Sequence, residues 1–312
     1  MSKKLSNAKK IALWVIGILL VIIIGVVASG YFYLNHLISK TIEIKINKEN
    51  IGVTDEVEEK LSQYSDSIVN IALFGIDSND NEDGRSDSIM IATIDNANKK
   101  LKLTSIMRDS YVDIEGHGND KINHAYAFGG PELAINTLNR NFDLNIKDFI
   151  SVNFSTLPKI IDKLGGVDIE ITEEEVPHIS GIDSPGLYIL NGAQALQYSR
   201  IRYATGGDYR RTERQRTVLN SVFIKMLQMN ISTYPTLLNE ILPMVETNLK
   251  PSDILELGSE VLKMGKSTLE QERFPRDEYC QGQMINGIYY LVFDKAATVE
   301  QIHNYIFEDK LE

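Results

Sequence analysis

The sequence predicts an α/β protein in which one domain follows a single membrane-spanning helix. Three observations support this prediction: an uncharged apolar stretch near the N-terminus, alternating strand-length and helix-length apolar patterns after residue 68, and no convincing linker among them. A chain of 312 residues can form one large domain or two ordinary ones. The unbroken alternation of strands and helices favours one domain.

Residues 11–34 contain no charged side chain. A helix of this length spans about 36 Å, which is enough to cross a bilayer core with some tilt. Lysines precede the stretch, so the positive-inside rule makes residues 1–10 a cytoplasmic basic tail and places the rest of the chain outside. A cleaved signal peptide is the alternative, but its apolar region is usually only about 7–15 residues long. An uncleaved transmembrane helix is therefore favoured.

Composition excludes several classes of protein. The single cysteine, Cys280, rules out an internal disulfide framework and a multi-cysteine zinc site. A domain that folds outside the cytosol without disulfides suggests the envelope of a Gram-positive bacterium. The formal net charge of −11 argues against nucleic acid as a partner. No GxGxxG, Walker or GxSxG motif is present, so dinucleotide binding, NTPase chemistry and the commonest serine hydrolase chemistry are unsupported.

The elements follow from apolar periodicity. Residues 35–67 are polar and are predicted to form a stalk, with a short strand in the alternating segment 41–46 and a short helix near 55–64. Short β-branched apolar runs then predict strands at 68–76, 88–94 and 101–107. Further strands are expected at 149–154, 167–171, 269–274 and 288–293. Helical spacing predicts helices at 131–142, 155–164, 192–200, 208–230, 234–246, 251–264 and 298–307.

An arginine cluster stands out between residues 198 and 216. It contains six arginines and two acidic residues, although the protein as a whole is acidic. The arginines are Arg200, Arg202, Arg210, Arg211, Arg214 and Arg216. The planar guanidinium group suits bidentate contact with phosphate or carboxylate, so the cluster predicts an anionic partner. A solvated helix face with ion pairs is the alternative interpretation.

An acidic loop follows the first strong strand. Asp77 is expected at the end of that strand and Asp87 at the start of the next, so antiparallel pairing would bring the two carboxylates together. Two carboxylates with open positions are a usual way to hold Mg²⁺. An EF-hand loop is excluded because Met90 stands where the bidentate glutamate belongs. A solvated turn between two strands remains the other interpretation.

Arg108 and Asp109 directly follow the predicted strand 101–107. Strand ends are where α/β folds place their ligands. Taken alone, however, the two residues are also explained as a surface ion pair, which would stabilise the protein only slightly.

Several sequence blocks in one order resemble the LytR-CpsA-Psr family of bacterial envelope proteins. The blocks are FGID at 74–77, GRSDSIM at 84–90, SIMRDSYV at 105–112, KINHAYAFGG at 121–130, VNF at 152–154, KLGGVDI at 163–169, LNGAQALQYSRIR at 190–202 and GDYRRTERQR at 207–216. The resemblance covers roughly residues 68–225. It implies a single extracytoplasmic α/β/α sandwich domain with a mixed central sheet over residues 68–312, after one N-terminal transmembrane helix.

The resemblance also implies an activity. Members of this family transfer a glycopolymer, such as wall teichoic acid or capsular polysaccharide, from a polyprenyl-diphosphate carrier to peptidoglycan through a phosphodiester. The implied cofactor is Mg²⁺, or Mn²⁺ in its place. We therefore expect a single-pass protein of the cell membrane whose partners are the lipid-linked glycopolymer, the peptidoglycan acceptor and the lipid bilayer.

The family's site residues carry over by position. Asp77 and Asp87 match the metal-associated acids, and the diphosphate-binding set is Arg85, Arg108, Arg200, Arg202, Arg211, Arg214 and Gln215. Arg108, Asp208 and Arg211 are the expected catalytic residues. Asp208 would orient an arginine or accept the proton of the attacking hydroxyl, although an aspartate among arginines is a poor base.

The sequence departs from the family pattern at two positions. Asn79 stands where an arginine is common, and Arg210 stands where glycine is common. Two other functions remain open: an envelope regulator that binds the lipid diphosphate without turnover, and a hydrolase that releases polyprenyl phosphate.

Overall fold

The computed structural model describes residues 39–65, 67–77, 84–201, 207–229, 233–264 and 269–311. The described chain forms a seven-stranded mixed sheet in the order β1-β10-β7-β2-β3-β4-β11. The strands of this sheet are β1 (Ile42–Glu43), β2 (Ile68–Asp77), β3 (Arg85–Asp95), β4 (Lys100–Ile106), β7 (Asp148–Asn153), β10 (Val245–Thr247) and β11 (Leu269–Phe274). The predicted mixed central sheet is confirmed.

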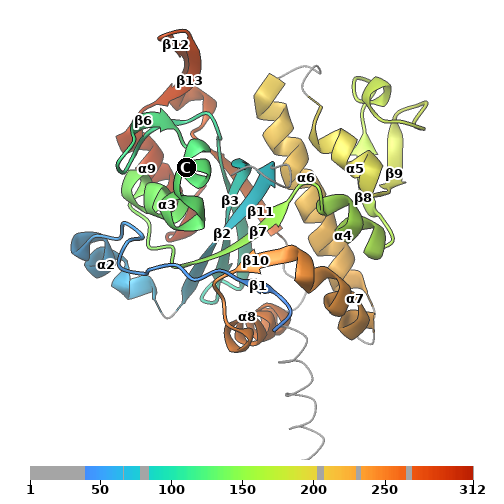
Figure 1. Cartoon of the computed structure of the whole chain (residues 1–312), viewed down its shortest axis with the longest axis horizontal. Coiled ribbons are helices and arrows are strands. Elements are labelled where there is room, and N and C mark those ends of the chain that lie inside the picture. Colours follow the sequence, from blue (N-terminus) through green and yellow to red (C-terminus); the bar gives the residue numbers. More distant parts are fainter. Residues whose placement is uncertain are drawn as a thin grey trace, which may run out of the picture.

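Helices cover both faces of the sheet, which gives three layers (Figure 1). One face carries α2 (Asp55–Leu61), α3 (His124–Phe142) and α9 (Lys295–Ile306). The other face carries α4 (Leu157–Lys163), α5 (Gly192–Ser199), α6 (Gly207–Gln228) and α7 (Tyr234–Ile241). The main apolar core lies between the sheet and α3 and α9, where Phe74, Ile91, Leu138, Phe149 and Tyr305 are buried.

Strand directions bring several chain ends to one side of the sheet. β2 is parallel to β7, and β11 is parallel to β4, while β3 runs antiparallel between β2 and β4. The C-terminal ends of β2, β4, β7 and β11 and the N-terminal end of β3 therefore share one edge, which we call the carboxyl edge. Open α/β sheets bind their ligands at such an edge.

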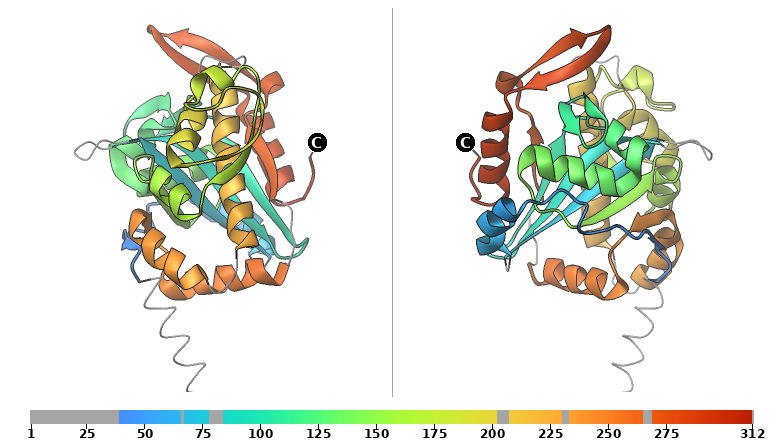
Figure 2. Two further views of the ribbon diagram at one scale, coloured as in Figure 1. Left: turned by 90° about the vertical axis from the view of Figure 1, so that its right-hand side faces the viewer. Right: turned by 60° about the vertical axis from the view of Figure 1, so that its left-hand side comes forward.

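Three two-stranded ribbons complete the fold. They are β5 (Tyr111–Ile114) with β6 (Gly118–Lys121), β8 (Val167–Ile171) with β9 (Gly186–Leu190), and β12 (Cys280–Ile285) with β13 (Ile288–Phe293). The β12–β13 hairpin projects at one end of the molecule, and α8 (Pro251–Met264) lies across the opposite end (Figures 1 and 2).

The described part of the predicted stalk belongs to the domain instead. β1 joins the main sheet by parallel pairing with β10, and both Ile51 and Leu61 are buried in the main core. The prediction was wrong because a few apolar contacts anchor a segment whose surface is otherwise polar. The predicted transmembrane helix at residues 11–34 lies outside the described residues, and none of the helices that are described is long and apolar enough to cross a bilayer.

Two predicted helices have different bounds. α3 begins at His124 rather than near residue 131 and is kinked at Gly129 and Gly130, where Gly130 adopts a φ of 63°. The segment 234–246 does not remain helical, because α7 ends at Ile241 and Val245–Thr247 pairs with β7 as β10. Pro243 cannot continue a helical hydrogen-bond ladder, which explains the early end.

Candidate functional site

A charged network lies at the carboxyl edge, on the side of the sheet that α3 covers. Arg108 follows β4, and its Nη1 donates a hydrogen bond to Oδ1 of Asp87 at 2.8 Å. Asn123, immediately before α3, donates to the same oxygen through Nδ2 at 3.2 Å. These contacts hold the start of β3, the end of β4 and the start of α3 together around one carboxylate.

A second carboxylate fixes Arg108 from another direction. Nε of Arg108 lies 3.3 Å from Oδ2 of Asp109, and Nζ of Lys121 lies 2.5 Å from Oδ1 of the same residue. Arg108 and Asp87 are both mostly buried, so these ion pairs are less screened by solvent than pairs at an open surface. The network therefore presents an arginine whose orientation is set before any ligand binds.

The backbone places Asp77 close to Asp87. Asp77 is opposite Arg85 in the β2–β3 pair, and the register shifts between Gly75 and Ile76. Asp87 is consequently the additional residue of a β-bulge, a feature that often re-aims a side chain near a site. β2 and β3 are antiparallel neighbours, as expected, but the side chain of Asp77 lies outside the described residues. The metal-binding role of the two acids remains a prediction.

The described residues fit a cation that keeps most of its own water. No group of three or more His, Cys, Asp or Glu side chains among them is arranged to hold a metal ion. Both hydrogen bonds that Asp87 accepts from Arg108 and Asn123 end on Oδ1. Mg²⁺ is commonly bound by one or two carboxylates, with waters and phosphate oxygens as its other ligands. The donor set at Asp87 is compatible with this kind of site.

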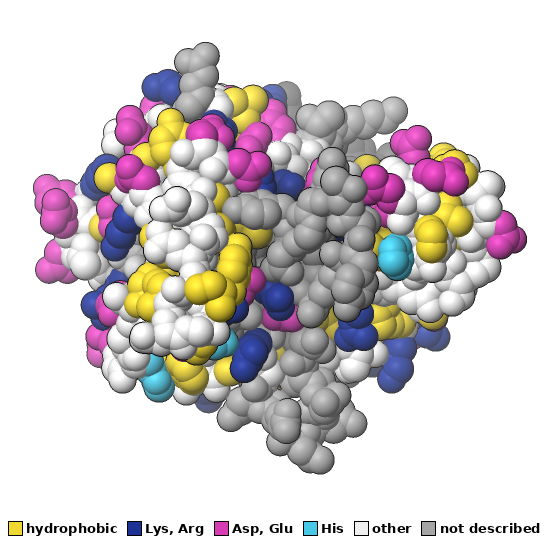
Figure 3. Space-filling model, turned by 90° about the horizontal axis from the view of Figure 1, so that it is seen from above, with side chains coloured by type: hydrophobic (Ala, Val, Ile, Leu, Met, Phe, Trp, Pro, Cys, Tyr) yellow, Lys and Arg dark blue, Asp and Glu magenta, His cyan; other side chains and the backbone are white. Residues whose placement is uncertain are grey.

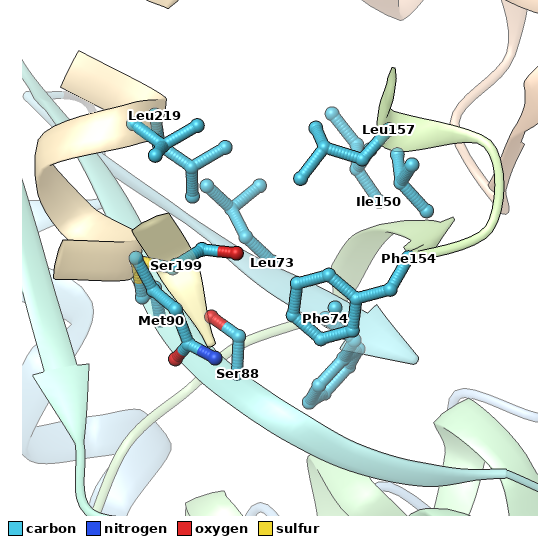
Figure 4. A pocket seen from close by; sticks show the side chains of 13 residues that line it. Leu73, Phe74, Ser88, Met90, Ile150, Phe154, Leu157, Ser199 and Leu219 are labelled. Carbon is cyan, nitrogen blue, oxygen red and sulfur yellow. The ribbon is translucent and has the colours of Figure 1, made fainter. Parts of the chain in front are cut away.

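An apolar cavity of about 150 Å³ lies on the opposite face of the sheet (Figure 4). β2, β3 and β7 form one wall, and α4, α5 and α6 form the other. The lining residues are Leu73, Phe74, Gly75, Ser88, Met90, Ile150, Val152, Phe154, Leu157, Ser199, Gln215, Val218 and Leu219.

The cavity has a polar end and an apolar end. Figure 4 shows Ser88 and Ser199 together, with Leu157 and Leu219 further away. On β2, Gly75 is nearer the carboxyl edge than Leu73, and Gln215 precedes Leu219 by about one turn of α6. The polar end therefore lies toward the carboxyl edge, and the apolar end extends away from it.

Gln215 contributes unused hydrogen-bonding capacity at the polar end. It is buried, it lines the cavity, and its Oε1 has no hydrogen-bond partner among the residues that the structure describes. A buried amide oxygen without a partner destabilises a fold unless a ligand or water satisfies it. The cavity thus suits a ligand with an apolar tail and a polar head.

The arginine cluster is divided between two helices. Arg200 caps the C-terminal end of α5 and is exposed, while Arg85 is exposed at the start of β3. Arg202 lies outside the described residues, and so do the side chains of Asp208, Arg210 and Arg211 on the first turns of α6. Seen from the carboxyl edge, Lys and Arg side chains lie near the middle of the molecule (Figure 3).

Arg214, which the sequence places in the diphosphate-binding set, forms a buried ion pair with Glu175. It is buried, with Nε 2.6 Å from Oε1 of Glu175 and Nη1 3.3 Å from the carbonyl oxygen of Ile201. Its position on α6 turns it toward the segment between β8 and β9 rather than toward solvent. Arg214 therefore connects Ile201, just after α5, to the segment between β8 and β9, and its predicted direct contact with a diphosphate gains no support from this geometry.

Three residues of this region had no role in the sequence-based prediction. Lys121 and Asn123 were part of a matching block, but only the folded chain shows their contacts with Asp109 and Asp87. Glu175 is one of three consecutive glutamates, and nothing in the sequence distinguishes it as the buried partner of Arg214. Burial raises the pKa of the neighbouring Tyr198 to about 12, with Glu175 adding to the effect, so this phenol is neutral.

Comparisons with known proteins agree with the fold and the sequence blocks. A sequence model of the LytR_cpsA_psr family matches residues 32–306. The chain is 35% identical over 264 residues to polyisoprenyl-teichoic acid–peptidoglycan teichoic acid transferase TagU of Enterococcus faecalis, covering 81% of this chain and 84% of that protein. It is 34% identical over 300 residues to TagU of Bacillus cereus, covering 93% and 94% respectively.

A solved structure gives the same result for the fold. The structure described as TagT bound to LIIa-WTA superposes with a TM-score of 0.66 at 25% sequence identity. The match covers 78% of this chain and 91% of that chain.

Proposed function

The chain belongs to the LytR-CpsA-Psr family, and from this premise we propose that it transfers a wall teichoic acid type of glycopolymer from a polyprenyl-diphosphate carrier to peptidoglycan. Like its TagU relatives, the chain is a transferase. The activity for which these relatives are named favours teichoic acid over capsular polysaccharide as the polymer. We propose the carrier, the polymer and the acceptor for this chain from its similarity to the TagU proteins.

One observation carries the proposal. The apolar cavity has its polar end toward the same sheet edge at which Arg108 and Asp87 form their ion pair. A polyprenyl diphosphate has an apolar tail and a strongly anionic head, so the cavity would take the tail. The head would then lie at the carboxyl edge, among cationic and hydrogen-bonding side chains.

The proposed step is a phosphoryl transfer. The oxygen of an acceptor hydroxyl attacks the phosphorus that carries the glycopolymer and forms a new phosphodiester bond. The bond from that phosphorus to the bridging oxygen breaks, and polyprenyl phosphate leaves with the electron pair. The hydroxyl proton passes to a base, a role for which Asp208 is the sequence-based candidate.

Arg108 would stabilise negative charge that develops on the diphosphate. Such reactions depend mainly on positioning and on electrostatic stabilisation. Because Asp87 and Asp109 orient Arg108 in the folded protein, little reorganisation is needed when the substrate binds. Gln215 would contribute a hydrogen bond near the head group, and exposed Arg85 and Arg200 would add positive charge around it.

We also propose Mg²⁺ as the cofactor, with Asp77 and Asp87 as its protein ligands. When bound, the ion would neutralise charge on diphosphate oxygens. Residues 11–34 are proposed as the membrane anchor, with the N-terminus cytoplasmic and the domain outside. Because the described chain enters the domain at the end opposite the carboxyl edge, the apolar end of the cavity would extend toward the membrane side (Figures 1 and 2).

The test is a reconstituted transfer assay with the full-length enzyme in detergent. The enzyme is incubated with lipid-linked polymer, soluble peptidoglycan oligomers and Mg²⁺, and the products are separated by mass. The proposal expects a polymer–glycan conjugate together with polyprenyl phosphate. Polyprenyl phosphate without conjugate would indicate a hydrolase, and neither product would indicate a binding protein; either result contradicts the proposed transfer.

A further inference from the structure

The β12–β13 hairpin carries exposed apolar side chains beyond the carboxyl edge. Met284 is 66% exposed and Tyr289 is 43% exposed, and the two residues are direct cross-strand partners on one face of the hairpin. In the view onto this end of the molecule, hydrophobic side chains lie at several places on the surface (Figure 3). Exposed apolar patches on a soluble domain commonly mark a binding surface.

The ring of Tyr289 lies against Gly282 of the opposite strand. A Cβ atom at Gly282 would come within 2.6 Å of Cε2 of Tyr289, so the absence of a side chain at Gly282 is what makes room for the ring. Nζ of Lys121 lies 5.9 Å from the centroid of the same ring. We call Tyr289, Met284 and the backbone of Gly282 the tyrosine platform.

The tyrosine platform is joined directly to the charged network. The backbone N–H of Leu291, on β13, donates to the carbonyl oxygen of Asp109 at 2.9 Å. Lys121 links the two regions a second time, because it contacts the ring of Tyr289 and forms an ion pair with Asp109. Asp109 in turn contacts Arg108. The position of the platform relative to Arg108 is therefore fixed by the fold.

We propose that the tyrosine platform binds a sugar ring of the acceptor glycan, an inference that rests on the proposed function. A transferase must bring two substrates to one place. The apolar cavity on the α6 side accounts for the lipid-linked donor, and the platform lies at the same edge on the other side of Arg108. The face of a pyranose ring is rich in C–H groups and its rim in hydroxyl groups. Tyrosine offers an apolar ring and a polar hydroxyl, which matches both.

Position favours a glycan over a lipid surface as the occupant. β1, where the described chain begins, lies toward the opposite end of the molecule from the hairpin (Figures 1 and 2). With the proposed anchor preceding β1, the hairpin points away from the bilayer and toward the space that peptidoglycan occupies.

The test compares acceptor and donor kinetics in the full-length enzyme. Tyr289→Ala is expected to raise the KM for peptidoglycan oligomers roughly tenfold or more, because the contact between the tyrosine ring and the sugar is lost. The KM for lipid-linked donor is expected to stay unchanged. Tyr289→Phe retains the ring and is expected to retain most acceptor affinity. Gly282→Val displaces the ring and is expected to raise the KM for the acceptor without changing the KM for the donor.

Matched controls use apolar residues of comparable exposure on the β8–β9 hairpin. Leu187→Ala and Ile189→Ala remove exposed apolar side chains away from the platform and are expected to change neither KM. An unchanged acceptor KM in Tyr289→Ala, with transfer still measurable, would overturn the proposal. So would a loss of binding to anionic lipid vesicles in Tyr289→Ala without an effect on the acceptor, since the hairpin would then contact membranes.

Direct binding separates this inference from the proposed function. Calorimetry with soluble peptidoglycan oligomers and no donor is expected to show binding that Tyr289→Ala weakens by the same factor. If the wild-type enzyme forms no conjugate but binds oligomers through Tyr289, the transfer activity is wrong and the glycan site stands. If it forms conjugate and Tyr289→Ala binds oligomers as the wild type does, the site is wrong and the activity stands.

Discussion

Arg108 Nη1 lies 2.8 Å from Asp87 Oδ1, and this ion pair joins the end of β4 to the start of β3. The two residues come from strands that run in opposite directions, so their side chains meet at the carboxyl edge. The pair holds the guanidinium group of Arg108 next to the carboxylate of Asp87, which is predicted to bind a metal ion. Arg108 is therefore oriented by the fold and not by the substrate.

Replacing Arg108 is expected to reduce turnover more than binding. Arg108→Ala should lower kcat for transfer by about 10²–10³, the usual effect of removing one preorganised electrostatic contact. Arg140→Ala is the control, because Arg140 is a partly exposed arginine that pairs with Asp113 and Glu115 on the outer side of α3. Steady-state kinetics with both variants make the test. Equal kcat in Arg108→Ala and wild type would exclude the assigned role.

Removal of the divalent ion is expected to stop the reaction, and Asp87→Asn should change its metal dependence. The amide of asparagine keeps an oxygen for Arg108 and Asn123 but loses the charge that attracts a cation. The Mg²⁺ concentration that gives half-maximal rate should therefore rise, while Asp148→Asn, at a surface pair with Lys48, should leave it unchanged. Identical Mg²⁺ titrations for Asp87→Asn and wild type would refute the metal assignment.

Filling the apolar cavity is expected to weaken donors with long tails selectively. Leu219→Trp adds volume at the apolar end, so the KM should rise for a long polyprenyl donor and much less for a short one. Overpacking also costs about 1–3 kcal/mol of stability, which thermal denaturation checks separately. Ile224→Trp, at an exposed position of α6, serves as the control. A tail-length dependence identical to that of the wild type would argue against the cavity as the tail site.

Breaking the Glu175–Arg214 pair is expected to destabilise the domain. Both side chains are 7% exposed, and removal of one partner leaves a buried charge without its counterion. The expected loss in free energy of unfolding for Glu175→Ala is about 3–5 kcal/mol. Lys48→Ala, which breaks a more exposed pair with Asp148, should cost at most about 1 kcal/mol. Chemical denaturation measures the free energy of unfolding of both variants. A loss for Glu175→Ala no larger than for Lys48→Ala would show that the buried pair does not stabilise the domain.

Acid is expected to destabilise the fold through His303. Burial, with the positive charge of Lys60, lowers the pKa of His303 below 6.5, and its Nε2 lies 3.1 Å and 3.0 Å from the carbonyl oxygens of Phe142 and Asp143. The unfolded chain therefore takes up a proton at a higher pH than the folded chain does. Protonation of His303 does not affect stability well above pH 6.5, and it lowers stability as the pH falls below that value.

His303→Gln tests this prediction, because glutamine can donate a hydrogen bond but does not titrate. The free energy of unfolding is compared between about pH 7 and pH 5 for the variant, for wild type and for the control His178→Gln. The decline toward acid should be smaller in His303→Gln than in the other two proteins. An equal decline in all three would remove His303 as the cause.

Local patterns were sufficient to predict most strands and helices of this fold. β2 is a largely apolar run, and the predicted positions of β2, β4 and β11 agree with the structure within a residue or two. β10 was not predicted because it has only three residues, and β1 joins the sheet by pairing with β10, about 200 residues away in the chain. Pairing between distant short segments leaves almost no local signal.

The candidate site was predictable where it depends on strand ends. Asp87 lies near the start of β3, and Arg108 follows the end of β4. Because these two strands are antiparallel, both residues lie at the same edge of the sheet. The contacts of Asn123 and Lys121 depend on where the chain after β6 packs, which periodicity does not specify. Arg214 shows the same limit: its sequence neighbours suggest an open arginine face, but the β8–β9 region covers it and Glu175 neutralises it.

Photo-cross-linking of the donor's tail shows directly whether the tail occupies the apolar cavity. A polyprenyl diphosphate with a photoreactive group in its tail is irradiated with the full-length enzyme, and cross-linked residues are identified by mass spectrometry. We expect cross-links to cavity residues such as Leu73, Ile150 and Leu219, which excess unlabelled lipid diphosphate abolishes. Cross-links confined to α3, α9 or the β12–β13 hairpin would contradict this expectation.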